Sequence, residues 1–158
     1  MTVQALLVCT SISAYRNTER IAHSMASALG AEVVAPRDVT TRDVAAFGLV
    51  GFGSGIYSFT FHPDLWRLAR ALPRVDGAGA FVFSTSGGPE YLFRPSTILF
   101  EALLHRRGYQ MTGRFSCRGA YDWGTPRLPR GNVGRPNDAD LALARRHAEA
   151  WSSARIRP

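Results

Sequence analysis

The chain has 158 residues, of which 46% are hydrophobic and 20% are charged, a composition typical of one globular domain and not of a disordered chain. No apolar run approaches the roughly 20 residues that a membrane-spanning helix needs, and the N-terminus lacks the pattern of a signal peptide. We therefore expect a soluble, cytoplasmic protein that has no membrane partner. The cysteines Cys9 and Cys117 and the four histidines lack the spacing of metal ligands, so we expect reduced thiols and no structural metal.

The charge is unusual because all 19 basic residues are arginines, against 12 acidic residues, which gives a net charge of +7. Such a balance suits an anionic cofactor, an acidic partner or nucleic acid. The arginines are spread along the chain and form no block of like charges. We therefore do not expect a nucleic-acid partner.

Apolar runs that suit buried strands alternate along the chain with amphipathic segments that suit helices. In chain order, the sequence predicts the strand Val3–Cys9, the helix Asn17–Leu29, the strands Glu32–Ala35 and Phe47–Phe52, the helix Pro63–Leu72, the strand Ala80–Ser84, the helix Ser96–Arg107, the strand Tyr109–Cys117 with a bulge near Gly113, and the helix Asp138–Ala150. This alternation predicts an α/β domain over residues 1–152, with one five-stranded parallel sheet between two helical layers and a tail at 153–158. Right-handed crossovers favour the strand order 2-1-3-4-5.

In such a sheet, ligands bind beyond the carboxyl ends of the strands, which directs attention to the loop Ser11–Thr18 after the first strand. The N-terminus of the following helix offers unpaired N–H groups and a positive dipole end, which suit a phosphate. Hydroxyl and amide side chains add donors and Arg16 adds a charge. The alternative is that Asn17 or Thr18 only caps the helix.

Several segments, in the right order, resemble those of flavodoxins. The loop ending in Asn17-Thr18-Glu19-Arg20 is similar to the family's phosphate-binding segment, Ser/Thr-x-Thr-Gly-x-Thr. Gly51–Tyr57 resembles the segment beside the flavin ring, and Ser84–Gly87 resembles the third flavin-contacting loop. The segments Gly113–Gly119 and Gly131–Asp138 look like those of a bacterial subgroup of the family.

The resemblance implies a flavodoxin-like three-layer sandwich with FMN as its cofactor. The phosphate loop keeps the first and last hydroxyls of the pattern, but Tyr15 replaces the second threonine and Arg16 replaces the glycine. Glycine there permits a positive φ that arginine does not adopt freely. Either Arg16 turns outward and a modified phosphate site survives, as we expect from the neighbouring donors, or the site is degraded.

The resemblance also assigns the residues that would bind the cofactor. The predicted phosphate contacts are Ser11, Ser13, Tyr15, Arg16, Asn17 and Thr18. The predicted contacts of the flavin ring are Ser54, Gly55, Ile56, Tyr57, Thr85, Ser86, Gly87 and Gly88. The alternative for Tyr57 is an aromatic side chain that closes the core, and this ambiguity extends to Phe59, Phe61, Tyr91 and Phe93.

Two further features of the sequence each have a functional and a structural interpretation. The pair Tyr121 and Trp123 either leans over the ligand cleft or pins a loop to the domain, and the second interpretation is the commoner one. His62 either donates a proton beside the flavin or starts the helix at Pro63, and again the structural interpretation is the commoner one. No catalytic residue is predicted.

Taken together, these features predict an FMN-binding redox protein, either an electron carrier or a small FMN-dependent NAD(P)H oxidoreductase. Its partner would be a redox protein or a small-molecule acceptor. Standard flavodoxins are acidic and dock on basic partners, so the charge of +7 favours an acidic partner or a stand-alone enzyme. The alternative is a domain that has lost FMN and serves as a cofactor-free enzyme or binding module.

Overall fold

The computed structural model of the chain describes residues 3–122, 127 and 130–154. Among these residues, no helix combines the length and the hydropathy that crossing a membrane requires.

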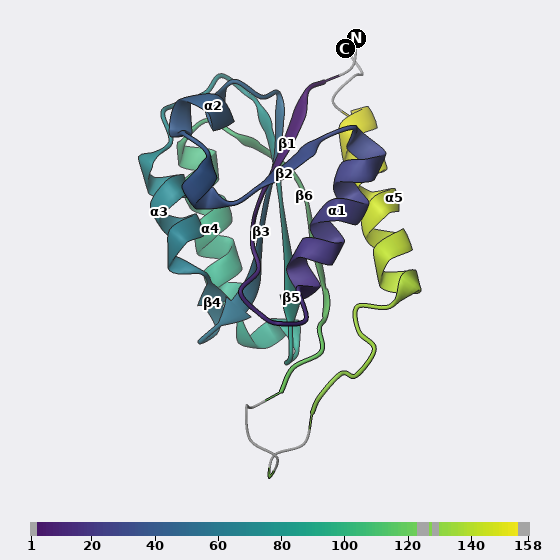
Figure 1. Cartoon of the computed structure of the whole chain (residues 1–158). Helices are drawn as coiled ribbons and strands as arrows, with labels where there is room; N and C mark the ends of the chain where they lie inside the picture. The colour runs from purple at the N-terminus through teal and green to yellow at the C-terminus, as the bar shows by residue number, and fades with distance from the viewer. Residues whose placement is uncertain (1–2, 123–126, 128–129, 155–158) are drawn as a thin grey trace.

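One parallel sheet forms the middle layer of the molecule (Figure 1). Its strands lie in the order β2-β1-β3-β5-β6, which is the predicted order of the five main strands. Their bounds are Ala5–Thr10 for β1, Glu32–Val34 for β2, Leu49–Tyr57 for β3, Gly79–Ser86 for β5 and Gln110–Arg118 for β6. The flavodoxin-like α/β architecture is thus confirmed.

Two details of the sheet bear on the sequence predictions. The register between β5 and β6 shifts between Ala80 and Phe81, whose partners are Met111 and Gly113, so the predicted bulge is present. No strand was predicted at Thr60–Phe61, where the structure has β4. This strand pairs antiparallel with the end of β3. This short strand folds the chain back at the edge where the ligand loops gather.

Helices cover both faces of the sheet (Figure 1). One face carries α1, Asn17–Leu29, and α5, Asp138–Ala154, which therefore includes the first two residues of the predicted tail. The other face carries α2, Thr41–Ala45, α3, Pro63–Ala71, and α4, Arg94–Arg106, with short 3₁₀ turns at Pro36–Asp38 and Glu90–Leu92. The side chain of Thr40 caps α2 by accepting a hydrogen bond from the Asp43 N–H.

The core consists of two apolar clusters, one on each face of the sheet. Strands that are buried on both faces explain why the sequence shows continuous apolar runs rather than alternation. On the α1/α5 face, β3 supplies glycines where β5 supplies phenylalanines. A Cβ at Gly53 would lie 2.1 Å from the Phe83 ring, and one at Gly51 would lie 2.5 Å from the Phe81 ring. The absent side chains therefore make room for the rings.

Candidate cofactor site

The loop between β1 and α1 turns into the helix through Arg16. Its backbone adopts φ 52° and ψ 38°, the left-handed conformation that a glycine provides in the flavodoxin pattern. The guanidinium pairs with Glu19 at 2.7 Å, and the side chain is 69% exposed. Arg16 thus keeps the turn of the loop while its side chain points away from the interior.

The first turn of α1 has several backbone N–H groups without an acceptor in the helix. Within the helix, the first N–H with a backbone acceptor is that of Arg20, which donates to the Arg16 carbonyl at 3.0 Å. The N–H groups of Asn17, Thr18 and Glu19 precede it and have no acceptor within the helix. Together with the helix dipole, these donors form a site suited to an anion.

The side chains of Asn17 and Thr18 are buried and do not cap the helix. The Asn17 amide donates to the Ala120 carbonyl at 2.7 Å, and the Thr18 hydroxyl bonds to that of Thr85 at 2.7 Å. The Asn17 Oδ1 is buried without a hydrogen-bond partner among the described residues. Asn17 and Thr18 therefore tie this loop to two other chain segments, and one buried acceptor remains for a donor group.

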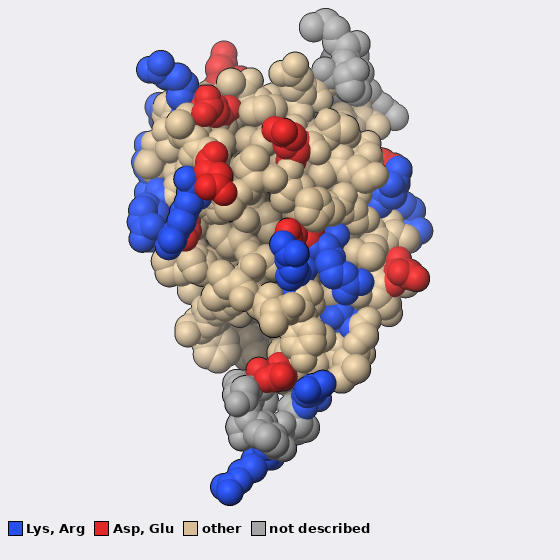
Figure 2. Space-filling view, viewed as in Figure 1, with Lys and Arg blue, Asp and Glu red and all other residues tan. Residues whose placement is uncertain are grey.

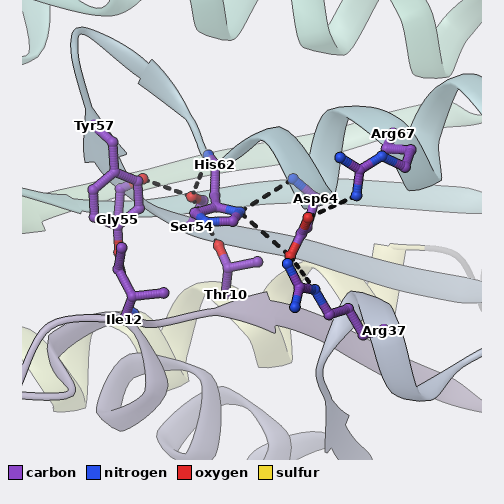
Figure 3. Close-up of polar contacts among 9 residues, drawn as sticks. All are labelled: Thr10, Ile12, Arg37, Ser54, Gly55, Tyr57, His62, Asp64 and Arg67. Atoms are coloured by element: carbon purple, nitrogen blue, oxygen red, sulfur yellow. Dashed lines mark hydrogen bonds and ion pairs between the residues drawn. The ribbon is translucent and has the colours of Figure 1, made fainter.

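Ser54 and Tyr57, at the end of β3, hold the neighbouring loops in place (Figure 3). The Ser54 hydroxyl accepts from the Thr10 hydroxyl at 3.0 Å and from the His62 N–H at 2.9 Å, and it donates to the Gly55 carbonyl at 2.6 Å. The Tyr57 hydroxyl accepts from the Ile12 N–H at 3.3 Å. Burial raises the pKa of Tyr57, so its phenol stays neutral at physiological pH.

Two hollows open at this edge of the sheet. The smaller, of about 120 Å³, lies at the start of α1 and is too small for a drug-sized molecule but accommodates a group of a few atoms. The larger, of about 1120 Å³, extends outward. They share the wall residues Ser13, Ile56, Tyr57, Ser86, Gly87 and Tyr121. The two hollows thus adjoin, and together, as a narrow inner end and a wide outer one, they are called the cavity.

The turn between β3 and β4 forms the outer rim of the larger hollow. Ser58 and Phe59 have φ values of 50° and 64°, which are costly for residues with side chains. Phe59 lines the hollow and is 62% exposed, so it is a rim residue and not part of the core. Glycine or asparagine commonly marks such a turn, and the absence of both here left the sequence without a signal.

A second wall comes from the segment that follows β6. The Tyr121 ring lies against Gly87, where a Cβ would be 2.7 Å from the ring, and against Gly131, where a Cβ would be 2.0 Å from it. Tyr121 pairs with Gly131 in an isolated bridge. The Asn132 side chain donates to the carbonyls of Gly87 at 3.0 Å and Gly119 at 3.1 Å. Tyr121 thus both pins this segment and lines the cavity, whereas Trp123 lies outside the described residues.

The structure brings almost all the predicted site residues to this cavity. The narrow or the wide hollow is lined by Ser11, Ser13, Tyr15, Asn17, Thr18, Gly55, Ile56, Tyr57, Thr85, Ser86, Gly87 and Gly88. The two exceptions are Arg16, which points outward, and Ser54, which is buried behind the wall. Eight further lining residues carry no signal in the sequence that predicts a place in the site: Ile12, Ala14, Ser58, Leu92, Gly119, Ala120, Asp122 and Arg130.

His62 begins α3 and does not line the cavity. Its Nδ1 accepts from the Asp64 N–H at 3.1 Å, which is the helix-start role (Figure 3). Arg37, and to a smaller extent Arg67, lower the pKa of the Asp64 carboxyl by hydrogen bonding to it. Burial raises the thiol pKa of both Cys9 and Cys117 to about 12, so neither is a thiolate at neutral pH.

Among known proteins, no protein-family profile matches the chain. The chain is 31% identical over 151 residues to the uncharacterized protein MJ0298 of Methanocaldococcus jannaschii, covering 94% of this chain and 97% of that protein. That relative is archaeal, so membership of a bacterial subgroup stays a prediction.

Solved structures of flavodoxins share the fold. An archaeal flavodoxin superimposes with a TM-score of 0.69 at 16% identity, covering 96% of this chain and 97% of that one. Oxidised flavodoxin 1 of Bacillus cereus gives 0.71 at 18% identity, with 98% and 99% covered. A WrbA-like flavodoxin of Agrobacterium tumefaciens gives 0.71 at 14% identity, with 97% of each chain covered. At these identities the likeness establishes the fold alone.

Proposed function

Because the chain belongs to the same family as MJ0298 of M. jannaschii and has a flavodoxin-like fold, we propose that it is an FMN-binding redox protein. The observation that carries the proposal is the cavity at the carboxyl edge of the sheet. Its narrow end meets the free N–H groups of α1 and suits a phosphate. Its wide end, between Tyr57 and Tyr121, suits a planar ring system.

The residues present fit FMN in chemistry as well as in size. The N–H groups of Asn17 and Thr18 and the hydroxyls of Ser11 and Ser13 would hold the phosphate. The unpartnered Oδ1 of Asn17 would accept a hydrogen bond from a ribityl hydroxyl. The neutral phenol of Tyr57 adds no negative charge to the cavity.

When bound, FMN supplies reversible one- and two-electron chemistry, and the chain orients and shields it. Of the described residues that line the wide hollow, only Asp122 and Arg130 bring a charge, and both are exposed. His62, the one candidate proton donor, lies elsewhere. The site thus offers little acid–base chemistry, which favours the role of an electron carrier.

One observation favours the second role, that of an FMN-dependent NAD(P)H oxidoreductase. The wide hollow, about 1120 Å³, exceeds the usual 300–1,000 Å³ or so of ligand pockets. It therefore has room for a second planar molecule stacked beside the first. Consumption of NAD(P)H with a soluble quinone as acceptor tests this role, and a rate no faster than that of free FMN rejects it.

The visible spectrum of the purified protein tests FMN binding itself. Flavin absorption bands and release of FMN on denaturation support the proposal, as does quenching of flavin fluorescence when FMN is added to the apoprotein. A colourless protein that also refuses added FMN would point to the alternative, a domain that has lost its cofactor. The substitutions at Tyr15 and Arg16 in the phosphate loop motivate that alternative.

A further inference from the structure

An open groove of about 1160 Å³ runs between α3 and α4, outside the cofactor cavity. Its floor is apolar and includes Phe61, Trp66, Leu99 and Leu103. Leu99 is 65% exposed, a high value for a leucine on a helix that packs on a sheet. Trp66 is fixed in place because its indole N–H donates to the Thr60 hydroxyl at 3.0 Å and its ring contacts Phe100 edge-on at 5.0 Å.

The rim of this groove is basic. Of the residues that the structure describes, four arginines and no acidic residue line it. The arginines are Arg67, Arg70, Arg106 and Arg107. Figure 2 shows basic side chains along the flank of the molecule that α3 occupies in Figure 1. Arg67 pairs with Asp64, but neither Arg70 nor Arg106 forms an ion pair with any residue of the described ranges. The groove therefore carries uncompensated positive charge around an apolar floor.

An apolar centre rich in aromatic residues and bordered by arginines is the composition of protein interfaces. Nucleic-acid surfaces instead offer aromatic faces on which bases stack. Here the Arg70 guanidinium covers the Trp66 ring, 5.2 Å from its centre, so that face is already occupied. We propose that the α3–α4 groove docks an acidic partner protein, which would be the electron donor or acceptor if the FMN function proposed above holds.

The position of the groove suits such a partner. Thr60 and Phe61 line the groove, and the residue before them, Phe59, lines the wide hollow of the cofactor cavity. The Thr60 hydroxyl bonds to that of Ser96 on α4, which joins the β3–β4 turn to the groove wall. A protein bound here would therefore lie beside the rim of the FMN cavity without entering it.

Titration of the full chain with a purified acidic ferredoxin at low ionic strength tests the proposal. The double variant Arg70→Glu/Arg106→Glu reverses the uncompensated charges of the groove. The matched control, Arg42→Glu/Arg146→Glu, makes the same change of net charge at exposed arginines of α2 and α5. We expect the groove variant to weaken binding by roughly tenfold or more and the control by less than about threefold. Added salt should narrow that difference.

Three outcomes would overturn the docking site. The first is no binding of ferredoxin to the wild-type chain, and the second is equal weakening of that binding by the two double variants. The third is loss of duplex DNA binding in the groove variant while its ferredoxin binding stays unchanged. Leu99→Ser tests the apolar floor without changing charge, and unchanged ferredoxin affinity in that variant also counts against the site. FMN titration of the same samples separates the two proposals. A chain that refuses FMN but binds ferredoxin through the groove rejects only the FMN function, and one that takes FMN but ignores the groove charges rejects only the docking site.

Discussion

The two walls of the cofactor cavity are built by different means. The wall formed by the loop before α1 is local in sequence, and its donors follow from the start of one helix. The described part of the wall after β6 is held by contacts between distant residues, such as the hydrogen bonds of Asn132 to Gly87 and Gly119. Among the described residues, a buried hydrogen bond from the Asn17 amide to the Ala120 carbonyl joins the two walls. The comparison indicates that the first wall supplies hydrogen-bond donors and the second supplies shape.

Removing the bond that joins the walls should have the largest effect. In Asn17→Ala the Ala120 carbonyl loses its partner, so we expect the free energy of unfolding to fall by about 1–3 kcal/mol. FMN affinity should fall roughly tenfold, because the second wall is no longer held over the phosphate end. Urea denaturation and fluorescence titration with FMN measure the two effects.

Ser24 offers a matched control for that variant. Its hydroxyl donates to the Leu141 carbonyl at 2.8 Å, which ties α1 to α5 away from the cavity. Ser24→Ala should therefore cost stability and leave FMN affinity unchanged. Equal FMN affinities in the Asn17 and Ser24 variants would mean that the two walls are not coupled through Asn17.

The second wall alone is tested by removing its aromatic ring. Tyr121→Ala should weaken FMN binding about twofold to tenfold, since an aromatic contact contributes about 0.5–1.5 kcal/mol. Tyr121→Phe keeps the ring and should bind FMN within about twofold of the wild type. A similar loss in both variants, measured by FMN titration, would show that the hydroxyl and not the ring matters.

An ion pair between Arg135 and Asp140 ties the end of the second wall to the start of α5. The Arg135 Nε donates to the Asp140 Oδ2 at 2.6 Å, and the Arg135 Nη2 donates to the Asp140 Oδ1 at 2.8 Å. Burial alone would raise the pKa of Asp140, but hydrogen bonds from Arg135 and the Asn137 N–H outweigh it, so the pKa is lowered. A lowered pKa means that the stabilisation is complete above the unfolded value, near 3.9, and is lost as pH falls through the folded value.

Asp140→Asn should therefore lower the free energy of unfolding by about 1 kcal/mol at pH 7, which is about 2–4 °C in Tm. Well below the folded pKa, the variant and the wild type should melt alike. Thermal denaturation across this pH range checks the prediction. A difference that persists undiminished in acid would place the effect on packing rather than on the ion pair.

The smallest effect is expected in the first wall, at Arg16. Arg16→Gly relieves a left-handed conformation that costs about 1–2 kcal/mol for a residue with a side chain. It also loses an exposed ion pair and gains chain entropy in the unfolded state, so the net change should stay within about 1 kcal/mol, on the stabilising side. FMN affinity should not fall, because the Arg16 side chain does not line the cavity. A marked loss of affinity in the FMN titration would reassign Arg16 to the phosphate site.

Much of the fold could be predicted because its elements carry periodic signals. The helix Asn17–Leu29 was predicted to the residue, and the alternation of apolar runs with helices gave the sheet order. The ends of β3 and β5 were predicted too short, because both strands continue past their apolar runs through the small or polar residues Gly53–Gly55 and Thr85–Ser86. Hydrogen bonds to neighbouring strands extend β3 and β5 there, and the sequence of one strand does not show which residues its neighbours will bond.

The two walls of the candidate site differ in how well the sequence predicted them. The local wall could be predicted because helix starts and hydroxyl-rich loops have a recognisable composition. The positions of Ala120 and Asn132 could not, because they depend on hydrogen bonds to residues far away in the chain. Phe59 was missed as a definite site residue for a different reason, since its positive φ occurs where neither glycine nor asparagine announces a turn.

The glycines of β3 that face the rings of β5 have a consequence for how this family can vary. Gly53 and Phe83 share one volume, as do Gly51 and Phe81, so neither partner of a pair can change size alone. Among homologous sequences, these positions are expected to covary, with a larger residue on one strand matched by a smaller one on the other. Such paired exchanges would trace the sheet register independently of any cofactor-binding residue.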